Sequence, residues 1–209
     1  MAIAFVRNTL GGGTTPLNQN LSYLPVAGNL LVVGIGNNSN ILNSITSITD
    51  SAVPANVYTR ATSDWASGYS STELWYAKNI VPASGIHNLT VTSSIPGTTI
   101  QLAINEYSGI DVSSPLDQTA ATETASSATI NAGPTGTTTV NDELVVMVGS
   151  QQAAATLTVG AGYSNFNQAT GVAPVAIQSK VVASTGTQSG TMATSITANV
   201  TGLIATFKA

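Results

Sequence analysis

Short runs of β-branched and other apolar residues, set between turn sequences, recur along the whole chain and constrain its fold more than any other feature. Alternation of apolar and polar residues within such runs is the pattern of β-strands. The stretches most tolerant of a helix, TAATETASSAT (119–129) and QQAAAT (151–156), lack an apolar stripe. Many short strands at this spacing favour an antiparallel β-sandwich of jelly-roll type over βαβ units. We therefore expect an all-β fold.

The turn sequences divide the chain into candidate strands. We expect strands near residues 2–7, 19–24, 29–36, 44–49, 57–62, 71–79, 86–94, 98–108, 127–131, 136–140, 143–150, 156–161, 174–183, 190–197 and 200–207. Residues 1–19 are expected to form an N-terminal arm or edge strand, with GGGTTP as a flexible joint. The remainder, 20–209, is expected to be one sandwich domain. Its Pro/Thr/Ser-rich segment 111–139 predicts a long crossover, because strong strands flank it on both sides.

Two uninterrupted apolar runs echo each other along the chain. NLLVVGIG (29–36) and DELVVMVG (142–149) both place an LVV-type run directly before a glycine. An uninterrupted apolar run is typical of a strand that is buried on both faces. A short run of common residues recurs by chance, so the echo does not establish a duplication. It predicts two central core strands, one in each sheet.

The low charge of the chain excludes one class of partner and favours another. Only 7% of the residues are charged, and five Lys and Arg residues are spread over 209 positions, with a net charge of −4. No basic stripe is present to neutralise phosphates, so nucleic-acid binding is not expected. Because 43% of the residues are hydrophobic, the chain can bury a core and should fold. A surface with so few charges favours burial in an assembly, and we expect a homo-oligomer.

The sequence gives little information about the cellular compartment of the protein. The chain has no cysteine, which excludes disulfides, thiolate metal sites and thiol nucleophiles together. No stretch approaches the length of about 20 apolar residues that a membrane helix needs. The first residues, MAIAFVRNTLGGGTTPLNQ, have no basic region followed by an apolar run of signal-peptide type, which argues against classical secretion.

The segment STELWYAKNIVPASGIHNLTVTSS (70–93) contains one of the two tryptophans and the only histidine. Its alternation predicts two strands paired as a hairpin, the first with one partly wet face. On this interpretation Trp75 packs in the sandwich and His87 lies at the hairpin end. The alternative is that Trp65, Tyr69 and Trp75 form a platform on which sugar rings stack.

Catalytic and metal-binding patterns are missing from the sequence. His87 has no GxSxG-type turn to supply a serine nucleophile. The densest acidic set is Glu106, Asp111, Asp117 and Glu123, in or beside a predicted loop, and it has no recognisable calcium-loop spacing. Turn chemistry, with side chains accepting hydrogen bonds from nearby backbone N–H groups, is the preferred interpretation of the two aspartates. We expect no catalytic residues, no cofactor and no metal site.

An ordered series of motifs resembles a known domain type. The motifs are NLLVVGIG, ITDSAVPANVYTRATS, STELWYAKNI, GIHNLTVTSS, IQLAINEYSGIDVSSPLDQT, ELVV and GLIATFK. Together they are similar to a recurrent jelly-roll-like β-sandwich domain of bacterial surface proteins and of phage virion proteins of the decoration (cement) type. The match covers roughly residues 28–150 and continues more weakly to the end. The order of the motifs carries it more than any single motif.

The resemblance implies a domain used for display, adhesion or assembly, without a catalytic motif. Because this chain stands alone and starts without a signal peptide, the virion side of the resemblance is favoured. The expected function is that of a structural virion protein at the particle surface, which contacts the major capsid protein or other virion proteins. The alternative is a carbohydrate-binding or adhesin-type module at the cell surface or outside the cell, which uses exposed aromatics to bind a glycan.

Overall fold

A computed structural model describes residues 2–66 and 70–209 and confirms an all-β, antiparallel fold. In chain order the strands are β1 (Ala4–Thr14), β2 (Leu17–Asn20), β3 (Leu30–Asn37), β4 (Ile45–Asp50), β5 (Tyr58–Ala66), β6 (Ser70–Ala77), β7 (Asn88–Ser93), β8 (Thr99–Ser108), β9 (Leu116–Ala132), β10 (Glu143–Gln151), β11 (Leu157–Thr158), β12 (Ser164–Ala169), β13 (Val175–Val182) and β14 (Gly190–Lys208). Among the described residues no helix is long and apolar enough to cross a membrane.

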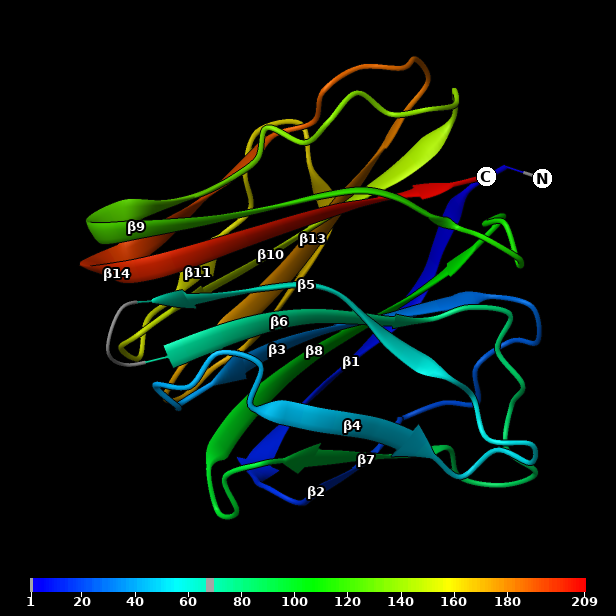
Figure 1. Cartoon of the computed structure of the whole chain (residues 1–209). Coiled ribbons are helices and arrows are strands. Elements are labelled where there is room, and N and C mark those ends of the chain that lie inside the picture. Colours follow the sequence, from blue (N-terminus) through cyan, green and yellow to red (C-terminus); the bar gives the residue numbers. More distant parts are fainter. Residues whose placement is uncertain (1, 67–69) are drawn as a thin grey trace.

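The strands form three sheets (Figure 1). Sheet A has the order β1-β8-β3-β6-β5, sheet B the order β2-β7-β4, and sheet C the order β11-β14-β10-β13-β12, with β9 also paired to β14. In sheets A and B the first strand pairs with the eighth, the second with the seventh and the third with the sixth. This is the order of a long hairpin that has been rolled up, as in a jelly roll.

Sheet A is the middle layer of the molecule (Figure 1). One of its faces packs on sheet B through a core that includes Val33, Ile48 and Leu89. Its other face packs on sheet C through a second core that includes Val32 and Val146. A third core lies on the far side of sheet C, under the curled ends of β9 and β14.

The two echoed runs form β3 and β10, which occupy the centres of sheets A and C, as the sequence predicts. Every residue of both strands is buried, which explains the absence of alternation. Close approach of the loop between β12 and β13 requires glycine at position 36 of β3. A Cβ atom at Gly36 would lie 2.3 Å from the carbonyl oxygen of Ala173, far inside van der Waals contact.

The N-terminal residues are edge strands of the protein's own sheets. β1 pairs with β8 in sheet A, and β2 pairs with β7 in sheet B. GGGTTP is therefore not the expected flexible joint, because Gly11–Gly13 are paired within β1. The chain turns there from sheet A to sheet B, and a Cβ atom at Gly11 would overlap the side chain of Gln19.

Most of the expected crossover at 111–139 is the long strand β9. Its sequence has many Thr, Ser and Ala residues and no apolar stripe, and most of its side chains are exposed or half-buried. The strand expected near 136–140 is absent, and β12 was not predicted.

The hairpin expected within residues 70–93 is wrong. β6 pairs with β3 and β5 in sheet A, whereas β7 pairs with β2 and β4 in sheet B, so residues 78–87 connect two layers. The expected wet face of β6 is wrong as well. Thr72 and Glu73 are both fully buried, because each face of β6 is covered by another sheet. Thr72 bonds to Thr201 of sheet C, and Glu73 accepts hydrogen bonds on the sheet B side.

Candidate functional site

A buried polar network lies where sheet B meets the loops that follow β4 and β6. Its centre is Asp50, the last residue of β4. The loop 51–57 leads from it to β5, and the loop 78–87 ends at His87, directly before β7. Since β4 and β7 are paired with Asp50 opposite Leu89, the register brings Asp50 and His87 together from positions far apart in the sequence.

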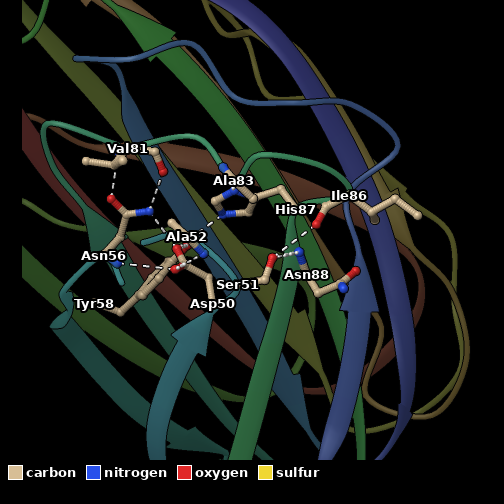
Figure 2. A network of polar contacts seen from close by, with 10 residues as sticks. All are labelled: Asp50, Ser51, Ala52, Asn56, Tyr58, Val81, Ala83, Ile86, His87 and Asn88. Atoms are coloured by element: carbon tan, nitrogen blue, oxygen red, sulfur yellow. Dashed lines mark hydrogen bonds and ion pairs between the residues drawn. The ribbon is translucent and has the colours of Figure 1, made fainter. Parts of the chain in front are cut away.

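The Asp50 carboxylate is a hub for both loops (Figure 2). Oδ1 accepts hydrogen bonds from the backbone N–H groups of Ala52 (3.1 Å) and Asn56 (3.2 Å). Oδ2 accepts from Asn56 Nδ2 (2.7 Å), the Tyr58 hydroxyl (3.0 Å) and His87 Nε2 (3.1 Å). A carboxylate offers about four lone-pair positions, so its acceptor capacity is used in full.

Both ring nitrogens of His87 are occupied. Nδ1 accepts the Ala83 N–H at 3.2 Å, so the ring proton lies on Nε2 and is donated to Asp50. Ser51 does not complete a catalytic triad, since its Oγ donates to the Ile86 carbonyl and accepts the Asn88 N–H. A general base needs a ring nitrogen directed at its nucleophile, and this geometry provides none.

The network is built to fasten two loops. Asn56 also pairs with Val81 through two hydrogen bonds, from its Nδ2 to the Val81 carbonyl (2.9 Å) and from the Val81 N–H to its Oδ1 (2.7 Å). Burial and the adjacent Asp50 carboxylate raise the pKa of the Tyr58 hydroxyl, which keeps it a donor. The side chains of Asp50 and His87 are fully buried. The arrangement fixes loops 51–57 and 78–87 to each other.

Two further buried carboxylates perform similar roles nearby. Glu106 of β8 accepts hydrogen bonds from the Val26 N–H (2.7 Å) and Asn29 Nδ2 (2.6 Å), which fixes loop 21–29, and Arg7 lies 3.3 Å from its other oxygen. Glu73 of β6 instead holds the start of β4, where its Oε1 accepts the Ile45 N–H at 3.0 Å.

The surroundings of Glu73 complete a compact cluster. Its Oε2 accepts hydrogen bonds from Arg60 Nε (2.7 Å) and Trp75 Nε1 (2.9 Å), and the Arg60 guanidinium lies over the Trp75 ring at 4.8 Å from the centroid. Burial raises the pKa of the Glu73 carboxyl above its ordinary value, and the Ile45 N–H and the Arg60 charge offset part of the rise.

Asp50 and Glu106 support one end of the N-terminal half, which we call the loop end: loops 21–29, 51–57, 78–87 and 109–115. Backbone hydrogen bonds join the loops to one another, from Gly28 N–H to the Ile80 carbonyl and from Ile80 N–H to the Asn29 carbonyl. Lys78 Nζ donates to the Ser113 carbonyl. Large apolar side chains are exposed on all four loops: Leu24, Val26, Val53, Val57, Ile86 and Val112.

The structure does not bring the aromatic candidates into one platform. Trp75 is buried beneath Arg60 with 7% of its surface exposed, so its ring faces are unavailable to a sugar. Trp65 is 37% exposed and lies opposite Ser71, four residues along β6 from Trp75, a distance of roughly 13 Å. Tyr69 lies outside the described residues. Trp65 is therefore the one described member with an accessible ring.

The acidic candidates have different roles, and the turn interpretation holds for Asp111 but is wrong for Asp117, which lies in β9 and bonds to a residue 22 positions away. Asp111 Oδ1 accepts the backbone N–H groups of Ser113 (2.6 Å) and Ser114 (2.9 Å), as the turn interpretation predicts. Asp117 accepts two hydrogen bonds from Thr139. Glu106 is buried in the network above, and Glu123 lies in β9. Within 2–66 and 70–209, no group of three or more acidic, histidine or cysteine side chains could hold a metal ion.

Comparison with known proteins gave no match to a family model, a curated protein or a solved structure.

Sequence reasoning missed Asp50 and its partnership with His87. The available signal was the position of each residue, Asp50 at the end of one strand and His87 directly before another. That signal becomes informative only when β4 and β7 are known to be neighbours, and the mistaken β6–β7 hairpin concealed it.

Proposed function

We propose that the protein is a structural component of a virus particle surface, of the phage decoration type, which acts through protein–protein contacts and self-associates through the loop end. The observation that carries the proposal is the exposure of Val53 and Val57, at 89% and 78%, on a loop fixed by Asp50. Isolated exposed valines are ordinary, but here six large apolar side chains are gathered on four joined loops.

Rigidity of the loops supports a binding role. Association normally loses free energy to ordering of side chains and loops, and surfaces ordered in advance avoid that loss. The buried hydrogen bonds of Asp50 and Glu106 hold the loops in one conformation before any partner arrives. An apolar loop that remained flexible until it met a partner would not need these buried hydrogen bonds.

A second copy of the chain is the partner that the charges favour. Of the charged groups near the loop end, Lys78 donates to a backbone carbonyl and Asp111 accepts two backbone N–H groups. With 14 charged residues in the chain, little like-charge repulsion opposes the approach of two such ends. The sequence resemblance described above supports a virion as the location of such an assembly and the major capsid protein as a contact.

The glycan alternative has the exposed ring of Trp65 as its support. A single ring can stack one sugar, but the platform expected from the sequence needed a second tryptophan, and Trp75 is buried. Protein–protein contact through the loop end is therefore the stronger proposal.

The experiment measures the native mass of the purified protein by light scattering over a hundredfold concentration range. A monomer has a mass of 21.1 kDa, and we expect a closed oligomer that the double variant Val53→Ser/Val57→Ser converts to monomer. Replacing these valines leaves the Asp50 network intact, because its contacts to this loop involve Ala52 and Asn56.

The matched control is Val181→Ser, which alters a valine that is 53% exposed on β13, outside the loop end. It should leave the native mass unchanged. A wild-type protein that stays monomeric throughout, or an oligomer that survives the double variant, would contradict self-association through the loop end.

A further inference from the structure

The two halves of the chain have the same strand order. Sheet A reads β1-β8-β3-β6-β5, and the C-terminal half reads β9-β14-β10-β13-β12. Matching the strands in sequence order makes β3 equivalent to β10, β5 to β12 and β6 to β13. Every neighbouring pair is antiparallel in both halves.

The small sheet is repeated as well. Sheet B has β7 between β2 and β4, and in the C-terminal half the first residues of β14 lie between the end of β9 and β11. Thus β9 corresponds to β1 and β2 joined, and β14 to β7 and β8 joined. The breaks between the N-terminal strands have counterparts in the register shifts within the β9–β14 pair.

The two halves pack against each other through equivalent faces of sheets A and C. Across this contact the strand order of one sheet runs opposite to that of the other. β1 lies against β12 and β5 against β9, although β5 is the equivalent of β12 and β1 that of β9. In the same way β8 faces β13 and β6 faces β14, with β3 and β10 in contact at the centre. Such reciprocal contact is the property of an isologous, two-fold interface.

We infer that residues 2–110 and 111–209 are two copies of one jelly-roll unit. The outer face of each unit's large sheet, sheet A or sheet C, then has a second copy of the same unit as its partner. The core between sheets A and C is then an intramolecular form of a dimer interface, with Leu30, Val32 and Tyr107 on one side and Val146, Val148 and Phe207 on the other. Each unit also has its own core between its large and small sheets.

The sequence echo between residues 29–36 and 142–149 does not carry this inference. Aligning Gly36 with Gly149 places Leu31 opposite Leu144. However, Leu31 faces the small sheet of its unit, whereas Leu144 faces the other unit. A shift of one residue exchanges the faces of a strand, so the echo is out of register with the structural equivalence. Strand order and reciprocal contact are the evidence.

The test is a cut between the units in the full-length protein. A site-specific protease sequence is inserted between Ser113 and Ser114, which are exposed in the connection from β8 to β9, and the folded protein is cleaved there. We expect the two pieces to remain associated, with unchanged native mass. The cut adds a dissociation step to unfolding, so on tenfold dilution the urea midpoint of the cut protein should fall further than that of the uncut protein carrying the same insertion.

The control carries the same insertion between Ser184 and Thr185, in the exposed connection from β13 to β14 within one unit. Cleavage there releases β14 from its own unit, and we expect loss of native circular dichroism, because one strand has no core of its own. The inference is overturned if the cut at 113/114 causes the same loss, or if the two pieces separate at micromolar concentration. Neither result depends on whether the intact protein forms oligomers through the loop end.

Discussion

The two halves fasten their small sheets with different chemistry. In the N-terminal half the first residue of β4, Ile45, donates its N–H to the Glu73 carboxylate. In the C-terminal half the first residue of β11, Leu157, donates its N–H to the Gln168 amide at 3.0 Å. The strand that must be held is equivalent in both halves, but one half uses a buried ionisable group and the other a neutral amide.

The contrast extends beyond this pair of positions. Asp50, Glu73 and Glu106 fasten the N-terminal half, with Arg7, Arg60 and His87 as partners. The C-terminal half uses the amides of Gln151, Gln168 and Gln178 in this role. It also buries the Glu143 carboxylate, which accepts the Val140 N–H. Removing one partner of a buried ion pair leaves an uncompensated charge, whereas removing an amide leaves only unpaired hydrogen-bonding groups. The fold tolerates either solution, but the N-terminal half should be the more sensitive to substitution.

Glu73→Ala should have the largest effect. It leaves Arg60 without its carboxylate and the Ile45 N–H and Trp75 Nε1 unpaired, at about 3–5 kcal/mol of unfolding free energy. The matched change, Gln168→Ala, should cost about 1 kcal/mol, because that side chain is half-buried and neutral. Urea unfolding measures both values, and equal losses would remove the distinction between the halves.

Asp50→Asn should come next, at about 2–3 kcal/mol, because it leaves donors of the network unpaired. In one orientation the substituted amide nitrogen would face the backbone N–H groups of Ala52 and Asn56. In the other it would face Asn56 Nδ2, the Tyr58 hydroxyl and His87 Nε2. Hydrogen exchange should show faster opening of loops 51–57 and 78–87. Unchanged exchange in both loops would show that the hub does not fasten them.

Substitutions of the two tryptophans compare a core position with a surface position within the N-terminal half. Trp75→Phe removes the donor to Glu73 and should cost about 1–2 kcal/mol, whereas Trp65→Phe should change stability by less than about 0.5 kcal/mol. Thermal melts would measure both. A larger loss for Trp65→Phe would contradict the assignment of Trp65 to the surface.

The smallest effect is the pH dependence of stability. Burial raises the pKa of Glu73 in one half and of Glu143 in the other. A carboxyl whose pKa is higher in the folded state stabilises the protein while protonated, so its contribution falls as pH rises from the ordinary glutamate pKa through the raised value. We expect Glu143→Gln to flatten the decrease of the urea midpoint over this window. An unchanged slope of the urea midpoint against pH would show that Glu143 does not contribute to the pH dependence of stability.

Central strands were the most predictable part of the fold. β3 and β10 each contain an uninterrupted apolar run because both faces are covered, and that pattern is visible in the sequence alone. β9 was missed over its first residues because its side chains are polar and small, and its pairing with β14 supplies the stability that local sequence does not show.

Layer assignment and the candidate site could not be predicted for a common reason. β6 and β7 are adjacent in the sequence, and pairing them in a hairpin is the simplest interpretation, yet they belong to different sheets. The site depends on the same information, since Asp50 and His87 meet only through the pairing of β4 with β7. Pairing of distant strands depends on the whole roll of the chain, which no local pattern encodes.

Hydrogen exchange of the intact protein, measured by mass spectrometry, tests the two-unit account most directly. If two equivalent units share the core between sheets A and C, β3 and β10 should be the most protected strands and should be protected to a similar degree, while the edge strands β5 and β12 exchange earlier. Strong protection confined to one of the two halves, with the equivalent strands of the other exchanging freely, would contradict it.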